Sequence, residues 1–194
     1  EKYHNVNVDG TENIFKLAKE FGKKVVYASS SSIYGNTTTI PIQENFEKNP
    51  INPYGITKLD DEKLAKKFHD LGLSVIGLRY FNVYGIGQTN DYAGVITKFI
   101  DQINLNKSPI IFGNGTHTRD FISVEDIAKA NLLSMESNTD FSFLNIGTGI
   151  STSIKELAEL VIELSGKKLE ISFDDLPLGD VKDSLADVSL AKKL

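Results

Sequence analysis

The sequence has 194 residues, of which 40% are hydrophobic and 24% are charged, a composition typical of a globular protein and not of a disordered one. Its formal net charge of −5 argues against nucleic acid or an anionic membrane as a partner. The lack of cysteine excludes disulfides, thiolate catalysis and cysteine-based metal sites, and three scattered histidines do not suggest a metal site. Because the sequence shows neither a membrane-length apolar run nor a signal-peptide core, we expect a soluble, cytoplasmic protein.

Helix-like and strand-like segments alternate along the chain. In chain order, the apolar spacing predicts a helix over residues 6–22, a strand over 23–29, a helix over 52–72, a strand over 73–81, a helix over 93–104, a strand over 108–113, a helix over 123–137, a strand over 141–147, a helix over 153–166 and a last strand over 169–175. Strands that alternate with helices through right-handed crossovers predict an α/β fold with a parallel sheet.

Local signals support two of these elements. The first strand has a continuous apolar run, which is typical of a strand covered on both faces. The helix over 52–72 has Asn52 as a candidate N-cap, Pro53 at its first position and Gly72 at its end.

Four consecutive serines occupy residues 29–32, at the end of the first predicted strand. In open parallel sheets, ligands bind beyond the carboxyl ends of the strands. The segment "YFNVYG", residues 80–85, lies at the corresponding end of the next strand. These serines therefore predict a ligand site, although the alternative is that they only satisfy the backbone groups of a turn.

Tyr54 and Lys58 are spaced i, i+4 and so lie on one face of the predicted helix over 52–72. Free tyrosine, with a pKa near 10, is a poor base at neutral pH, but a nearby ammonium favours the phenolate and lowers that pKa. A serine hydroxyl at the same point can orient a substrate hydroxyl whose proton the tyrosinate takes. A tyrosine and a lysine at this spacing are common by chance, and the preceding serine cluster is what makes the combination specific.

Six segments together resemble the extended short-chain dehydrogenase/reductases, and among them the NAD-dependent nucleotide-sugar epimerases and dehydratases of the UDP-glucose 4-epimerase group. In order, they are "VVYASSSSIYG", "NPYGITK", "LRYFNVYG", "AGVITKFI", "IIFGNGTHTRDFISVEDIAKA" and "NIGTG". The resemblance extends over essentially the whole chain. It implies a Rossmann-like, doubly wound parallel sheet, without its N-terminal strands, and a small C-terminal substrate-binding α/β part.

The resemblance also implies roles for individual residues. Tyr54 would be the catalytic base, Lys58 would hold the nicotinamide ribose, and Ser30 would bridge the sugar hydroxyl and Tyr54; all three would contact NAD. Asn7 and Phe81 would complete the cofactor side. The implied substrate-binding residues are Asn82 at the diphosphate, Val95 and Phe112 at the uracil, Arg119 at a phosphate, Asp180 at a ribose hydroxyl and Ser184 at the sugar. Alternatives remain open: Val95 and Phe112 could belong to the core, and Arg119 could pair with Asp120.

Two features depart from the family pattern. The glycine-rich phosphate-binding turn is absent, and Pro177 stands where these epimerases often carry an arginine. On this basis we expect a piece of a longer protein, truncated at both ends. Residues 1–82 would be the C-terminal half of an NAD-binding Rossmann domain with the catalytic helix, and residues 83–194 would be interleaved Rossmann and nucleotide-sugar-binding segments. The 194 residues alone are expected to bind NAD weakly or not at all and to be inactive.

The resemblance implies epimerisation of a UDP-hexose at sugar carbon 4 through a 4-keto intermediate, with UDP-glucose and UDP-galactose as substrates. The small Ser184 extends this to the N-acetylated pair. A homodimer formed by the helices over residues 5–21 and 53–71 is also implied. One alternative is a dehydratase or reductase of the same family, although dehydratases carry Asp-Glu where this chain has Ser31 and Ser32. The other is a non-catalytic nucleotide-sugar-binding module.

Overall fold

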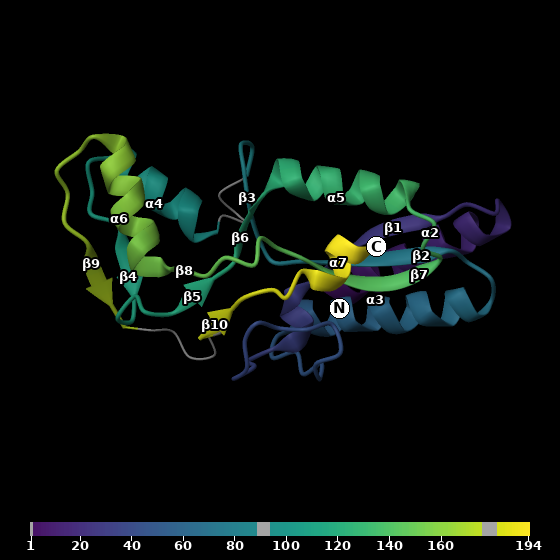
Figure 1. Ribbon diagram of the computed structural model, residues 1–194. Coiled ribbons are helices and arrows are strands. Elements are labelled where there is room, and N and C mark those ends of the chain that lie inside the picture. The colour runs from purple at the N-terminus through teal and green to yellow at the C-terminus, as the bar shows by residue number, and fades with distance from the viewer. Residues whose placement is uncertain (1, 89–93, 176–181) are drawn as a thin grey trace.

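The computed structural model describes residues 2–88, 94–175 and 182–194. Its main sheet has three parallel strands in the order β1-β2-β7: β1 (Val25–Ser30), β2 (Val75–Tyr80) and β7 (Phe141–Ile146). Two helices cover opposite faces of this sheet, α3 (Pro53–Asp70) on one side and α5 (Val124–Glu136) on the other (Figure 1). The predicted α/β fold with a parallel sheet is therefore confirmed.

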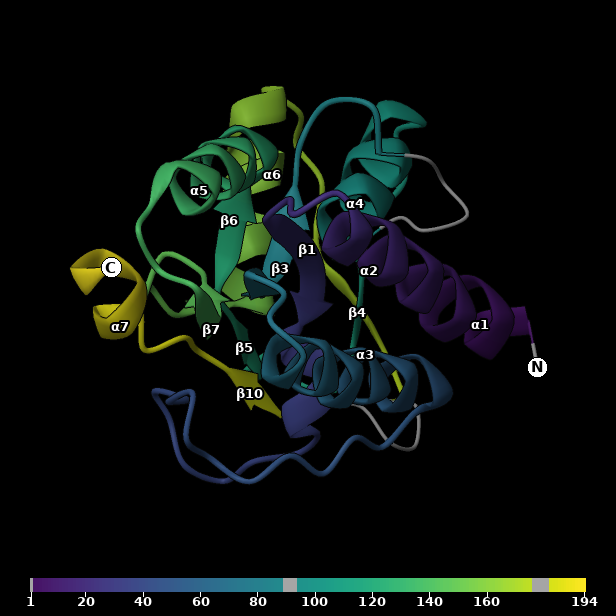
Figure 2. The same ribbon diagram turned by 90° about the vertical axis from the view of Figure 1, so that its right-hand side faces the viewer.

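The central strand β2 is buried because its alternate side chains enter two different cores. Val75 packs with Phe15 and Phe68 between the sheet and the helices α2 (Gly10–Glu20) and α3. Ile76 and Leu78 pack with residues of β7 and α5 on the other face. Burial of each such side chain contributes roughly 1.5–3 kcal/mol. Figure 2 shows the layers, with α3 below the strands and α5 above them.

The prediction that the first strand is covered on both faces was wrong in part. Along β1, Val25, Val26 and Tyr27 are half-buried and Ala28 is exposed, whereas Ser29 and Ser30 are buried. The physical reason is position: within the described residues β1 is at the edge of the sheet, with β2 on one side.

The helix expected over residues 6–22 is not one continuous α-helix, because its first residues form a π-helical turn. A short α1 (Lys2–His4) leads into a π-helical turn, η1 (Asn5–Asp9), before α2 begins. The helix predicted over 52–72 is α3. The Asn52 side chain accepts a hydrogen bond from the Gly55 amide at 2.7 Å, and Pro53 is the first helical residue, as expected.

The second part of the molecule is built from small elements at one end of the main sheet (Figure 1). Helices α4 (Val95–Asn104) and α6 (Ile154–Ser165) pack together beside the parallel pair β4 (Ile110–Phe112) and β9 (Ser172–Asp174). The other elements are η2 (Ser31–Tyr34), β3 (Asn82–Tyr84), β5 (Thr118–Arg119), β6 (Phe121–Ser123), β8 (Thr152–Ser153), β10 (Asp183–Ser184) and α7 (Ser189–Lys193). The three-residue strands β4 and β9 lie within the strands predicted over residues 108–113 and 169–175, whereas β3, β5, β6, β8 and β10 were not predicted because such short segments show no periodicity of their own.

Two small sheets lie between this part and the carboxyl ends of the main strands. Strand β3, which follows β2 directly, pairs in parallel with β6, and β5 lies between β10 and β8. None of the helices in the described part of the chain is long and apolar enough to cross a membrane.

Candidate active site

The serine run ends β1 and starts a 3-10 turn, and its members have different partners. Ser29 donates to the Glu62 carboxylate of α3 at 2.6 Å, so its hydroxyl has a structural role. The Ser30 side chain caps η2: its Oγ accepts from the Ser32 amide and donates to the Ser32 Oγ, both at 3.1 Å. The alternative interpretation, in which these serines satisfy the backbone groups of a turn, therefore holds for Ser30. Ser30 is 7% exposed, at the carboxyl end of its strand.

Helix α3 begins in tight contact with this serine turn. A Cβ added at Gly55 would lie 2.7 Å from the Ser32 carbonyl oxygen, so only glycine permits this approach. The adjacent Tyr54 is therefore held beside the serine turn, with 39% of its surface exposed. The structure thus brings Ser30 and Tyr54 together at the carboxyl end of β1.

Lys58 lies one turn along α3 from Tyr54. Its Nζ is 6.0 Å from the centre of the Tyr54 ring. The ammonium donates to the Ala28 carbonyl oxygen of β1 at 3.0 Å and to Asp61 Oδ2 at 3.3 Å. Lys58 is consequently fixed between the strand and its own helix, with its charge close to the tyrosine.

The two residues expected on the cofactor side lie in different surroundings. The Asn7 amide donates to Thr57 Oγ1 at 2.9 Å, which joins the π-helical turn η1 to α3 next to Lys58. Turns of this type are frequent at functional sites. Phe81 is 5% exposed and packs in a core with Ile33 and Ala186.

Behind the site lies a buried polar network whose residues were not predicted from the sequence. Arg79 of β2 forms two hydrogen bonds of 2.8 Å with the Glu62 carboxylate and donates to the Tyr34 hydroxyl at 2.6 Å. Tyr34 in turn donates to Asn145 Oδ1 of β7 at 2.7 Å. The network thus joins β1, β2, β7, η2 and α3. The signals in the sequence that could have indicated this network are Arg79, within the mostly apolar run of β2, and Glu62, on the inner face of α3.

Burial and charge determine the protonation of this network. Burial raises the pKa of Tyr34 to about 12, although the Arg79 guanidinium acts in the opposite direction, so the phenol remains a donor. For Arg79, burial acts to lower the pKa, but the hydrogen bonds and charge of Glu62 outweigh it and raise the pKa. The arginine and glutamate are therefore a charged pair.

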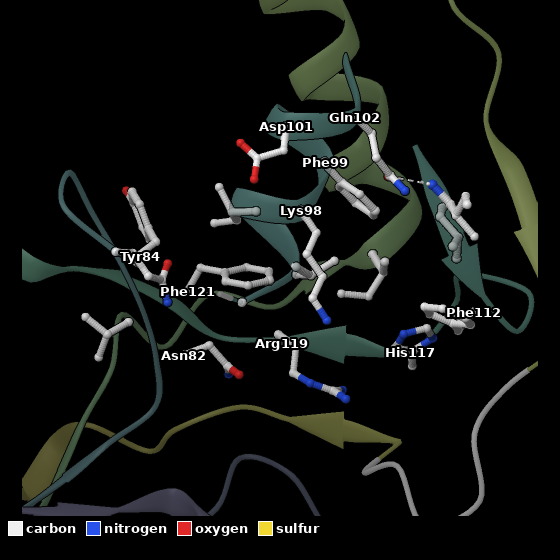
Figure 3. A pocket seen from close by; sticks show the side chains of 18 residues that line it. Asn82, Tyr84, Lys98, Phe99, Asp101, Gln102, Phe112, His117, Arg119 and Phe121 are labelled. Carbon is white, nitrogen blue, oxygen red and sulfur yellow. Dashed lines mark hydrogen bonds between the residues drawn. The ribbon is translucent and has the colours of Figure 1, made fainter. Parts of the chain in front are cut away.

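A cavity of about 600 Å³ opens beyond β2 and β3, in the second part of the molecule (Figure 3). Four of the six residues expected to bind substrate line it: Asn82, Val95, Phe112 and Arg119. Val95 also packs against the α4–α6 core, and Phe112 is 43% exposed. The core alternative thus applies in part to Val95 and not to Phe112.

The polar residues of the cavity come from three segments. The Asn82 amide donates to the Asp120 carbonyl oxygen at 3.1 Å, and the Arg119 guanidinium donates to the Thr118 carbonyl oxygen at 2.8 Å. The Asp120 carboxylate accepts hydrogen bonds from Thr148, Gly149 and Ala186, which accounts for its complete burial. Lys98 and His117, which were not predicted from the sequence, also line the cavity.

The last two substrate-binding candidates lie near the C-terminus. Ser184 is in β10, directly opposite Arg119 in the strand register, and is 8% exposed. Asp180, like Pro177, lies outside the described residues.

The catalytic candidates and the cavity both lie at the carboxyl ends of the strands of the main sheet. Ser30 is the register partner of Tyr80, and Tyr80 is two residues before Asn82 of the cavity. The cavity is lined by Lys98 and Arg119 and also by the acidic Asp101. Its two cations, next to a serine, a tyrosine and a lysine, suit an anionic substrate that carries a hydroxyl group.

Comparison with known proteins agrees with this geometry. The model of the NAD dependent epimerase/dehydratase family matches residues 1–147. A putative UDP-glucose 4-epimerase from Methanocaldococcus jannaschii is 40% identical over 194 residues, and a UDP-glucose 4-epimerase from Bacillus subtilis is 33% identical over 213 residues. These alignments cover 98% and 99% of this chain.

Solved structures show the same fold. A UDP-N-acetylglucosamine 4-epimerase from Methanobrevibacter ruminantium in complex with UDP-N-acetylmuramic acid matches with a TM-score of 0.95 and 38% identity, over 99% of this chain and 63% of that one. A UDP-glucose 4-epimerase from Thermotoga maritima with UDP-glucose matches with a TM-score of 0.91 and 34% identity, over 97% and 62%. The chain spans 63% of the length of each of the two curated relatives above. It belongs to the NAD dependent epimerase/dehydratase family.

Proposed function

We propose that this chain supplies the catalytic helix and the sugar-nucleotide cavity of an NAD-dependent UDP-hexose 4-epimerase. The observation that carries the proposal is the position of Ser30, Tyr54 and Lys58 at the sheet edge from which the cavity lined by Asn82 and Arg119 opens. The names of the relatives support it, since they include 4-epimerases of UDP-glucose, UDP-N-acetylglucosamine and UDP-glucuronate.

The residues around Lys58 fit a nicotinamide ribose. The ammonium has three N–H donors, and two of them point to Ala28 and Asp61, so one remains for a ribose hydroxyl as far as the described residues show. Tyr54 stays accessible beside it. When bound, NAD supplies the acceptance and return of a hydride at sugar carbon 4.

The protein residues would handle the proton and the position of the sugar. Ser30 would hold the hydroxyl at carbon 4 toward Tyr54 Oη, and the Tyr54 phenolate would take its proton as the carbonyl of the 4-keto intermediate forms. Lys58 would stabilise the phenolate by its charge. Arg119 would bind phosphate oxygens, for which the guanidinium geometry is suited. Tyr54 would return the proton to the opposite epimer.

Replacement of Tyr54 by phenylalanine tests this proposal in the complete gene product. The change removes the base and should lower conversion of UDP-glucose to UDP-galactose by ~10²–10⁴-fold, with NAD still bound. Tyr3→Phe is the control. The centroids of the Tyr3 and Tyr54 rings are 6.4 Å apart, and Tyr3 is 53% exposed, so loss of the Tyr3 hydroxyl should leave activity unchanged. Near-normal turnover of Tyr54→Phe would remove Tyr54 from the mechanism.

The same reaction mixture distinguishes the alternatives. A 4-epimerase yields a product of unchanged mass, whereas a dehydratase product is lighter by one water. Ser31 and Ser32 carry no carboxylate that could serve as the acid or base of an elimination, which favours the epimerase. Binding of UDP-sugar without turnover by the complete protein would support the binding-module alternative.

The exposed apolar side chains of the N-terminal helices, such as Val6, Ile14 and Leu17, support a homodimer that uses the helices over residues 5–21 and 53–71. Sedimentation equilibrium of the complete protein tests this, and a monomer at micromolar concentration would contradict it. From the same similarity to UDP-sugar 4-epimerases we propose a cytoplasmic location, which cell fractionation would test.

A further inference from the structure

Asp61 is a fully buried carboxylate next to the proposed catalytic lysine. Its side chain is 0% exposed, and its Oδ2 lies 3.3 Å from Lys58 Nζ, whose own side chain is 14% exposed. The other oxygen, Oδ1, has no hydrogen-bond partner among the described residues. A buried carboxylate with an unfilled oxygen is costly, so the pairing with Lys58 needs an explanation.

The groups that face Asp61 come from three elements. Lys58 and Asp60 are its neighbours on α3, the Thr11 hydroxyl faces it from α2, and Tyr27 lies near it on β1. Lys58 is the cation of this group, and it also donates to the Ala28 carbonyl oxygen at 3.0 Å. The ammonium is therefore held between a strand carbonyl and a buried anion, and not by Tyr54.

We propose that Asp61 is a positioning residue that anchors the Lys58 ammonium and offsets part of its charge, and so acts on Tyr54 through Lys58. The inference rests on the proposed function of Tyr54 and Lys58. With Asp61 ionised, the Lys58–Asp61 pair is nearly neutral, and Tyr54 experiences a weaker positive field than an unpaired lysine would produce. Asp61 thus limits how far the tyrosinate is stabilised while it keeps the ammonium at one place.

Asp61→Asn separates the charge from the anchor, because the amide oxygen still accepts from Lys58. Asp61 is seven positions after Tyr54 on the helix, which is about 10 Å along the axis. Loss of one charge at that distance, at an effective dielectric constant of ~20, shifts a titration by about one pH unit. We expect the acidic limb of the kcat/KM profile of the complete gene product to move to lower pH by about that amount, with kcat at the optimum retained.

A spectroscopic measurement does not depend on turnover. The ultraviolet titration of phenolate at alkaline pH, taken as the difference between a protein and its Tyr54→Phe version, isolates Tyr54 among seven tyrosines. With Asp61→Asn, the midpoint of this difference titration should move to lower pH by about one unit. Asp61→Leu, which removes the acceptor as well, should show the same shift and in addition a lower kcat.

Asp60→Asn is the matched control. Asp60 is adjacent on the helix, its side chain is 33% exposed, and it pairs with Lys63 at 2.7 Å. Solvent screens it, so neither titration should move by more than about 0.2 units. An unchanged midpoint in folded Asp61→Asn, or equal shifts in Asp60→Asn and Asp61→Asn, would overturn the positioning role. If the wild type has no epimerase activity the proposed function fails, while the difference titration still decides the role of Asp61.

Discussion

Replacement of Glu62 by glutamine tests how far the buried pair behind the active site stabilises the fold. The Glu62 carboxylate accepts two hydrogen bonds of 2.8 Å from Arg79 and one of 2.6 Å from Ser29. The two charged side chains are 5% and 3% exposed. Glutamine has nearly the same shape, but it lacks the charge and turns an N–H toward donors of Arg79 or Ser29.

The expected loss follows from what remains around the guanidinium. The Tyr34 hydroxyl and the Glu44 carbonyl oxygen still accept from Arg79, but both are neutral. A buried charge that loses its partner costs about 3–5 kcal/mol, which is a large part of the 5–15 kcal/mol that stabilises a typical domain. At a urea m-value of about 2 kcal/mol per molar, the unfolding midpoint should fall by about 1.5–2.5 M.

The assay is urea unfolding at pH 7, followed by far-ultraviolet circular dichroism. Glu12→Gln is the control, because Glu12 forms an i, i+4 pair with Lys16 at 3.3 Å on the surface, with side chains 34% and 58% exposed, and its loss should cost less than about 0.5 kcal/mol. In the double variant Glu62→Gln, Arg79→Met, no unpaired charge is left, so much of the lost stability should return. A loss below about 1 kcal/mol in Glu62→Gln would refute the reasoning.

Three further predictions concern the substrate cavity, the buried aspartate and the start of α3. Ser184→Tyr adds bulk at a buried position opposite Arg119, at a cost of ~1–3 kcal/mol. The kcat/KM for the N-acetylated UDP-sugars should therefore fall roughly 5- to 150-fold, while that for the plain UDP-hexoses stays nearly unchanged. Equal losses on both pairs would show that Ser184 does not face sugar carbon 2. Burial raises the pKa of Asp61 from 3.8 to about 6, so its contribution to stability is fully present below pH 3.8 and is lost as pH rises through 6. The wild type should therefore lose up to about 3 kcal/mol relative to Asp61→Asn between pH 4 and 7 in urea titrations, and a constant difference would contradict this. Gly55→Ala places a Cβ 2.7 Å from the Ser32 carbonyl oxygen and should lower both the melting temperature and turnover. Gly72→Ser has open space around the new side chain but a φ of +94°, so it should lower the melting temperature and leave turnover unchanged.

Elements whose signals are local could be predicted from the amino-acid sequence alone. Asn52, Pro53 and Gly72 delimit α3, and the i, i+4 spacing of Tyr54 and Lys58 places both side chains on one face of that helix. The apolar run of β2 predicts its burial because every residue of a central strand meets a helix on one face or the other. Family resemblance, and not periodicity, predicted four of the residues that line the cavity, Asn82, Val95, Phe112 and Arg119.

Features that depend on partners far apart in the chain could not be predicted from the sequence and follow from the tertiary fold. Glu62 meets Arg79, which is 17 residues away, and Tyr34 meets Asn145, which is 111 residues away. Strand β1 is half-buried because of its place in the sheet, and the two-residue strands exist because neighbours complete their hydrogen bonds. Asp61 is a charged residue in a helix with many others, and only its packing against α2 and β1 makes it buried. Local patterns record backbone preference and amphipathicity, whereas burial and the pairing of charges are set by which surfaces meet when the chain folds.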